Sequence, residues 1–170
     1  MKKNVLIIAA LLVVISVSAQ KYAYVDTDYI LKNIPSYKAA QEQIDKLSTE
    51  WQKEVEDKFA AIEKMYKDFQ AEKILLTDDL KKKRENEIVI KEKEARELQK
   101  KYFGPSGDLY SKREELVKPI QDEVYNAVKQ IALEGNFAIV FDTSSGPAIL
   151  FSDPKYDKSD EVLQKLGYKN

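Results

Sequence analysis

The sequence predicts an α+β protein in which a small β-containing body carries a long α-helical hairpin. Residues 36–134 have the charged, amphipathic pattern of long helices. Strand-like segments lie on either side of this region, at residues 22–27 and 137–152. Because a helix that leaves a sheet and returns to it must double back, the helical region is expected to form a hairpin. The predicted body comprises residues 20–35 and 135–170.

Residues 1–19 read as a signal peptide. Lys2 and Lys3 precede an apolar run over residues 5–17, and Val17-Ser18-Ala19 supplies the small residues that signal peptidase recognises. A membrane-spanning helix needs about 20 apolar residues, so this run is short for an anchor. We expect cleavage after Ala19 and a periplasmic location in a bacterium with two membranes. An uncleaved signal anchor is the alternative.

The body begins with a strand over residues 22–27, where aromatic and β-branched residues partly alternate. A short helical turn is expected over residues 28–34. Pro35 then suits the first turn of a new helix, because the N–H group that proline lacks has no partner at that position.

The outgoing helix of the hairpin starts there. Its apolar residues recur at alternating steps of three and four, which places them in one stripe that a single partner helix can cover. They are Tyr37, Ala40, Ile44, Leu47, Trp51, Val55, Phe59, Ile62, Tyr66 and Phe69.

Two interruptions divide the rest of the helical region. The hairpin tip is expected near residues 76–79, where Thr77 precedes two aspartates in the manner of a helix N-cap. A second break is expected at residues 104–108, because two glycines and a proline in five residues end or kink a helix. Helix resumes after it and reaches residue 134. We hypothesise that the second break is a hinge.

Short strands follow the hairpin. Gly135-Asn136 should close the helix, and strands are expected at residues 137–142 and 148–151, before a last helix at 160–166 that Ser159 caps. Two or three short strands cannot hold an independent core, so we expect a homo-oligomer. The residues predicted to form its oligomerisation body are Tyr24, Val25, Ile139, Val140, Phe141, Ile149 and Leu150.

The composition argues against catalysis. The chain has no His and no Cys, which removes imidazole bases, thiol nucleophiles and most transition-metal ligands. It has neither of the glycine-rich nucleotide-binding motifs. Catalytic residues, cofactors and metal sites are therefore not expected. With 28 basic and 29 acidic residues, the chain also lacks the strong positive charge that nucleic-acid binding requires.

Some apolar residues miss the stripe of the hairpin. Residues 88–90 are Ile-Val-Ile and spread over about 200° of helix, so they cannot all face one partner. The aromatic residues of the outgoing helix are assigned to the hairpin seam instead. The predicted client contacts are Ile74, Leu75, Leu76, Val89 and Ile90, with packing between neighbouring hairpins as the alternative.

The two ends of the chain resemble the OmpH family, the Skp-type periplasmic chaperones. The resemblance rests on the order of four features, namely the signal peptide, residues 24–27 (Tyr-Val-Asp-Thr), the long charged hairpin and residues 139–142 (Ile-Val-Phe-Asp). It implies a homotrimer that pools its short strands into one β-barrel. It also implies that the hairpins project as tentacles around a cavity, which holds unfolded outer-membrane proteins without ATP.

One departure from the family leaves a partner open. Skp-type tentacles are commonly basic, whereas this chain is slightly acidic, so binding to lipopolysaccharide or a membrane surface stays undecided. Residues 81–84 (Lys-Lys-Lys-Arg) form a local basic cluster that acidic neighbours on the same helix would offset. The alternative function is a structural or adaptor coiled coil of the cell envelope that binds a folded partner.

Overall fold

The computed structural model describes residues 20–144, 146 and 149–168, so the predicted signal peptide lies outside the described residues. The chain forms two compact units. One, called the body from here on, contains the residues up to Asn33 and those from Val124 onward, and the other, called the arm, is Ile34–Glu123. The predicted limits of the body, at residues 20–35 and 135–170, stay a prediction. Among the described residues, no helix has the length and apolar character that a membrane crossing requires.

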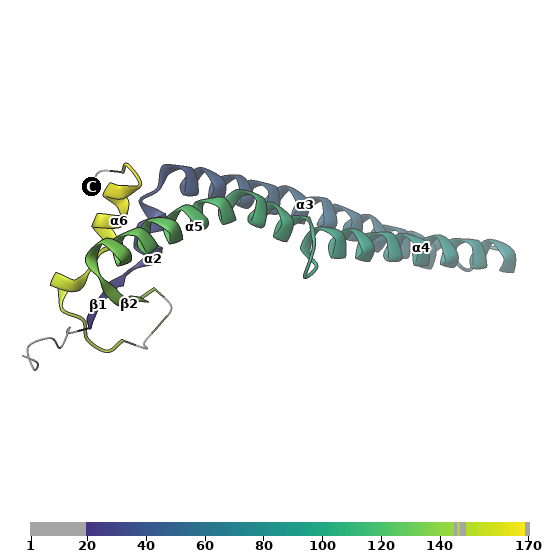
Figure 1. The fold of residues 1–170 in the computed structure, drawn as a ribbon. Coiled ribbons are helices and arrows are strands. Elements are labelled where there is room, and N and C mark those ends of the chain that lie inside the picture. The colour runs from purple at the N-terminus through teal and green to yellow at the C-terminus, as the bar shows by residue number, and fades with distance from the viewer. Residues whose placement is uncertain (1–19, 145, 147–148, 169–170) are drawn as a thin grey trace, which may run out of the picture. The chain divides into compact units, whose positions relative to one another are not determined.

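The body contains a sheet of two parallel strands, β1 (Lys21–Val25) and β2 (Phe137–Asp142) (Figure 1). Parallel neighbours need a long crossover connection, and here the whole arm lies between them in sequence. The register pairs Tyr22 with Ile139 and Tyr24 with Phe141, which places these four side chains on one face of the sheet.

The predicted strand over residues 148–151 is wrong for the described residues 149–151, which have no strand structure; Ala148 lies outside the described residues. A segment becomes a strand only when a neighbouring strand accepts its hydrogen bonds. Part of the free edge of β1 is already occupied, because the Lys158 N–H donates to the Tyr24 carbonyl and Tyr24 forms a bridge with Asp157. The strand-like composition of residues 149–151 is therefore not enough to make them a strand.

Two short helices pack together and provide the interior of the body. They are α2 (Thr27–Lys32) and α6 (Ser159–Lys165), and Ile30, Val162 and Leu163 are their fully buried residues. A short 3₁₀ helix, η2 (Pro154–Tyr156), precedes α6.

Ser159 ties the start of α2 to the start of α6. Its buried hydroxyl accepts a hydrogen bond from the Asp26 N–H at 2.9 Å and donates one to Asp157 at 2.6 Å. Ser159 is the first residue of α6, not its cap as the sequence suggested, since Lys158 occupies the cap position. A hydroxyl in this position links two segments that lie far apart in sequence.

Asp142 fastens the end of β2 to the start of α2. Its carboxylate accepts two hydrogen bonds from Thr27, at 3.2 and 2.7 Å, and two from Ser144, both at 3.0 Å. Partial burial raises the pKa of Asp142, but these hydrogen bonds outweigh burial and hold the pKa below its ordinary value. The ionised carboxylate is therefore the form that the folded body favours.

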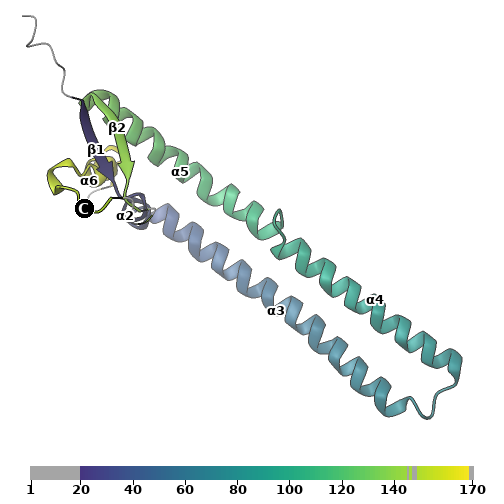
Figure 2. The ribbon, with the colours of Figure 1, turned by 90° about the horizontal axis from the view of Figure 1, so that it is seen from below.

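The arm contains the predicted hairpin, and the α+β fold class is confirmed. Helices α3 (Pro35–Glu72) and α4 (Asp78–Phe103) run antiparallel, and residues 73–77 join them (Figure 2). The sequence placed this tip near residues 76–79. The seam near the tip consists of four buried residues, two from each helix, and they are Ile62, Phe69, Ile88 and Ala95.

Two tyrosines fix the register of the hairpin with reciprocal hydrogen bonds. Tyr66 on α3 donates to Glu92 on α4 at 3.0 Å, and Tyr102 on α4 donates to Glu54 on α3 at 2.8 Å. These bonds to carboxylates raise the pKa of both tyrosines, because the hydroxyl loses its hydrogen bond and faces a second negative charge when it ionises. The Tyr102 ring also stacks on Trp51, with 4.7 Å between the ring centroids and 5° between the planes.

The second break separates α4 from α5 (Asp108–Gly135), and α5 contributes residues to both units. The break is hydrogen-bonded, because the Gly104 N–H donates to the Lys100 carbonyl at 2.8 Å and the Gly107 N–H donates to the Gly104 carbonyl at 2.9 Å. A Cβ atom on Gly107 would lie 2.7 Å from the carbonyl oxygens of Lys101 and Tyr102. Only glycine fits this close approach, and the hinge stays a prediction.

Candidate functional site

The outer face of the body sheet is apolar and open. Tyr22, Ile139 and Phe141 are each more than 40% exposed, and Tyr24 beside them is half-buried. The opposite face is covered, because Ala23 and Val25 are buried within the body. Alternation along a strand explains this division, since successive side chains point to opposite faces. We call this outer surface the body face.

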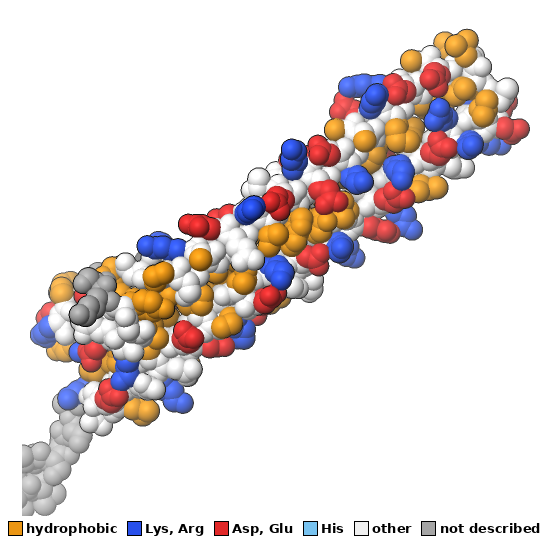
Figure 3. All heavy atoms as spheres, turned by 90° about the horizontal axis from the view of Figure 1, so that it is seen from above, with side chains coloured by type: hydrophobic (Ala, Val, Ile, Leu, Met, Phe, Trp, Pro, Cys, Tyr) orange, Lys and Arg blue, Asp and Glu red, His pale blue; other side chains and the backbone are white. Residues whose placement is uncertain are grey.

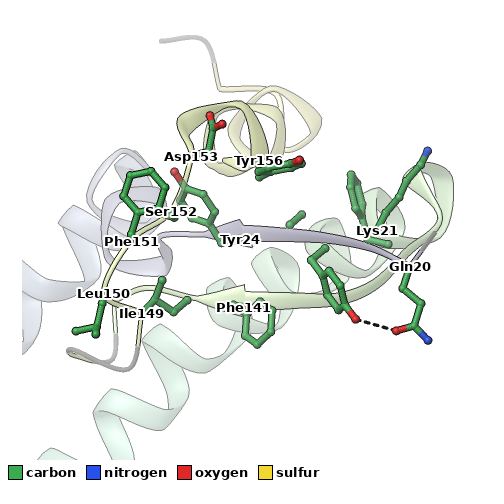
Figure 4. A pocket seen from close by; sticks show the side chains of 13 residues that line it. Gln20, Lys21, Tyr24, Phe141, Ile149, Leu150, Phe151, Ser152, Asp153 and Tyr156 are labelled. Atoms are coloured by element: carbon green, nitrogen blue, oxygen red, sulfur yellow. Dashed lines mark hydrogen bonds between the residues drawn. The ribbon is translucent and has the colours of Figure 1, made fainter.

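A cavity of about 1120 Å³ lies along β1 and reaches both faces of the strand, because Tyr22 and Tyr24 of the body face and Lys21 and Ala23 of the opposite face all line it (Figure 4). β1 and β2 form one wall, and residues 149–153 together with Tyr156 of η2 form the other (Figure 4). The apolar residues that line the cavity are Tyr22, Ala23, Tyr24, Phe137, Phe141, Ile149, Leu150, Phe151 and Tyr156. Six of these nine residues are aromatic, and a concave surface of this composition is a candidate interaction site.

Of the seven residues predicted for oligomerisation, four line this cavity, namely Tyr24, Phe141, Ile149 and Leu150. Ile139 shares the same face of the sheet but does not line the cavity. Val25 is buried inside the body, and Val140 is half-buried, so these two residues support the sheet from behind. The sequence analysis did not include Phe151, which is 86% exposed beside Leu150.

The second apolar surface is the hairpin tip. Ile74 and Leu75 lie in the loop between α3 and α4 and are 92% and 86% exposed. Figure 3 shows hydrophobic side chains at the free end of the arm among charged side chains of both signs. Leu76 differs from its neighbours, because it is half-buried and packs against the seam residues. The predicted contacts at the tip therefore divide into two exposed residues and one that supports the hairpin.

Two further predicted contacts lie on the outer side of α4. Val89 and Ile90 are 59% and 55% exposed, whereas Ile88 is 2% exposed. The difference follows from the helical turn of about 100° per residue, which leaves room in the seam for one residue of the three. The exposed aliphatic residues of the arm are thus Ile74 and Leu75 at the turn, Leu80 in the first turn of α4, and Val89 and Ile90 further along α4.

The basic cluster near the tip is partly neutralised. Lys81 forms an ion pair with Asp78 at 3.2 Å, and Arg84 forms one with Glu87 at 3.4 Å. Exposed pairs of this kind stabilise a helix weakly, but they reduce the field that a distant anion would feel. Among the described residues, no group of acidic side chains is placed to hold a metal ion.

Sequence reasoning missed a groove in the middle of the arm. Phe59 was expected to be a seam residue, yet it is 37% exposed, and Phe103 at the end of α4 is 39% exposed. They flank a groove of about 340 Å³ between α3 and α4. The stripe of apolar residues gave no signal of it, because the sideways offset between two packed helices decides which edge of a stripe stays open.

The sequence of both units matches a protein-family model. The family model described as outer membrane protein (OmpH-like) matches residues 21–166. The chain belongs to the OmpH-like family. The described hairpin and body also resemble the crystal structure of an OmpH-like outer membrane chaperone from Caulobacter crescentus CB15, with a TM-score of 0.68 and 12% sequence identity. That comparison covers 88% of this chain and 85% of the other. No curated protein sequence matches this chain.

Proposed function

We propose that this OmpH-like protein is an ATP-independent holdase chaperone of the periplasm. It binds unfolded outer-membrane proteins in a cavity between the hairpins of a homotrimer and prevents their aggregation in transit. The exposure of Ile74, Leu75, Val89 and Ile90 on an otherwise charged arm supports this proposal most directly. Unfolded β-barrel proteins expose the apolar residues that later face lipid, and scattered aliphatic residues can shield such chains.

The body face supports the proposed self-association. Two short strands do not make an independently stable sheet, and their outer face carries aromatic residues that a second copy can cover. The exposed aromatic side chains each bury about 150–250 Å² when they are covered. Strands of several copies that pair edge to edge would form a shared sheet that encloses the body face, and the barrel of the family is the arrangement that we propose.

Self-association also matters for client binding. Fully burying one aliphatic side chain stabilises a complex by about 1.5–3 kcal/mol, whereas association costs about 4–15 kcal/mol in lost freedom. Ile74 and Leu75 of one hairpin therefore cannot hold a client alone. Several hairpins held in one oligomer raise the effective concentration of such contacts, so that many weak contacts retain a chain and still release it.

The test is the suppression of aggregation of a urea-unfolded β-barrel protein by residues 20–170, without nucleotide. We expect suppression to saturate at one client per oligomer. Replacing Leu75, Val89 and Ile90 with Ser should weaken capture while the circular dichroism of the helices stays unchanged. Leu133→Ser is the matched control, because Leu133 is 68% exposed but lies in the body. An intact oligomer that suppresses no aggregation would count decisively against the proposal.

The adaptor function that the sequence left open is the other outcome of a second experiment. Affinity capture from a periplasmic extract should recover many outer-membrane proteins in substoichiometric amounts if the protein is a holdase. One stoichiometric folded partner would favour the adaptor.

A further inference from the structure

The groove in the middle of the arm has the dimensions and lining of a binding site for one side chain. Its six lining residues come from two helices, with Gln52, Val55, Glu56 and Phe59 on α3 and Gln99 and Phe103 on α4. Its volume of about 340 Å³ lies at the lower end of the range for ligand pockets. All of these residues belong to the arm.

The groove combines one buried aliphatic residue and two aromatic residues with three polar ones. Val55 is buried and forms part of the lining, while the two phenylalanine rings stay more than a third exposed. Phe103 packs edge-on against Tyr102 at 6.3 Å between centroids and 83° between planes, and Tyr102 stacks on Trp51. These ring contacts connect Phe103 to the aromatic pair that joins α3 and α4.

The polar residues of the groove indicate what kind of chain enters it. Gln52 and Gln99 carry amide groups that both donate and accept hydrogen bonds, as the backbone of an extended peptide requires. The Glu56 carboxylate, which accepts a hydrogen bond from the Gln52 amide at 2.9 Å, gives the groove a negative charge. This charge favours a neutral or basic segment over an acidic one.

A folded partner or a second copy of the chain is a poor match for this groove. A stable interface between folded proteins needs about 20–30 residues on each side. A short flexible segment needs only one anchored side chain and a few backbone contacts.

We propose that the groove binds one aromatic side chain, with its flanking extended backbone, from an unfolded client polypeptide. This proposal rests on the holdase function and adds a preference for aromatic residues to it. Aromatic rings gain edge-to-face contacts with Phe59 and Phe103 that an aliphatic side chain of similar area does not. The groove thus discriminates between client segments, whereas the exposed aliphatic residues of the tip do not.

The probe is a short unstructured peptide of Gly, Ser and Thr residues with one central Phe, compared with the same peptide carrying Leu. Titration is followed by the side-chain amide NMR signals of Gln52 and Gln99 and by the backbone amide signals of Ile74 and Leu75, in the oligomer of residues 20–170. We expect both signals to shift, and the Phe peptide to bind about 2- to 10-fold more tightly than the Leu peptide. Equal affinities, no shift of these signals, or shifts confined to Ile74 and Leu75 would overturn the proposal.

A variant that fills the groove separates specific binding from general stickiness. Gln52→Phe adds apolar area at an exposed position of α3 but occupies the groove, so the Phe peptide should lose its affinity advantage. Gln70→Phe is the matched control, because Gln70 is an exposed glutamine of α3 that does not line the groove. Peptide binding that is unchanged or tighter with Gln52→Phe contradicts the proposal. Aggregation suppression by the wild-type protein tests the holdase function separately.

Discussion

The body and the arm both expose apolar residues, but in opposite geometries. The body gathers aromatic residues around a cavity of about 1120 Å³. The arm exposes Ile74 and Leu75 at a turn and Leu80, Val89 and Ile90 on α4, and it also exposes Phe59 and Phe103 beside its groove. Charged residues lie between these positions in the sequence. A continuous concave surface is completed by one partner of matching shape and stays covered, whereas isolated aliphatic residues contact many chains weakly. We therefore expect permanent association at the body and reversible binding on the arm.

The largest expected effect concerns the body face. Replacing Tyr24 and Phe141 with Glu places two carboxylates on the body face. Self-association would bury each carboxylate without an ion-pair partner, which makes the free energy of association less favourable by about 3 kcal/mol or more for each charge. We expect at least a 100-fold weaker association, visible as monomers in sedimentation velocity. Tyr125→Glu, at an exposed site of α5 outside the cavity lining, should leave the oligomer intact. If the double variant still associates like the wild type, the body face is not the interface.

The second prediction concerns the seam of the arm. Phe69 is 5% exposed and packs with Ile62, Ile88 and Ala95. Phe69→Ala should lower the free energy of unfolding of the hairpin by about 3–5 kcal/mol, because it removes buried area and leaves a cavity. Urea titration followed by helical circular dichroism measures the loss. Ile74→Ala, five residues along the chain and almost fully exposed, should change this free energy by less than about 0.5 kcal/mol.

A smaller effect is expected at the junction of α4 and α5. A methyl group on Gly107 would meet two carbonyl oxygens at 2.7 Å, so Gly107→Ala must displace the backbone. We expect a loss of about 1–3 kcal/mol and faster amide hydrogen exchange between residues 103 and 109. Ser106→Ala is the neighbouring control. Strong protection of these amides from hydrogen exchange in the wild-type protein would exclude the hinge.

The smallest effect concerns the Asp142 carboxylate in the body. The pKa of Asp142 is lower in the folded state than in the unfolded state. Its contribution to the free energy of unfolding is therefore fully present above the unfolded-state pKa of about 3.9, and it is lost as pH falls through the folded-state pKa. Asp142→Asn should cost about 1 kcal/mol at neutral pH and nothing at the lowest pH. Unfolding curves of both proteins between pH 2 and 7 test this. A difference that grows as pH falls would contradict the assignment.

Much of the arm was predictable from sequence, because its helices depend on local signals. The three-four spacing of apolar residues identified α3, and the Gly-Pro-Ser-Gly segment identified the break between α4 and α5. Gly135-Asn136 was expected to end the last long helix, and Asn136 takes a positive φ of 52° directly after α5. These features need no knowledge of the rest of the chain.

The features that sequence missed depend on distant partners. The segment at residues 149–151 has strand-like residues, yet it is no strand, because strand structure requires a hydrogen-bonding neighbour. Leu76 looked like its exposed neighbours, but the path of the loop turns it against the seam. The groove beside Phe59 depends on how α3 and α4 are offset. In each case a three-dimensional arrangement overrides a local pattern.

Native mass spectrometry of residues 20–170, with and without an unfolded outer-membrane β-barrel protein, tests the division of roles between body and arm. The account predicts an oligomer that keeps its subunit number and gains one client. It also predicts that Tyr24→Glu with Phe141→Glu abolishes the oligomer. Replacing Leu75, Val89 and Ile90 with Ser should abolish client binding and leave the oligomer intact. A monomer at micromolar concentration, or client binding that survives both sets of substitutions, would contradict it.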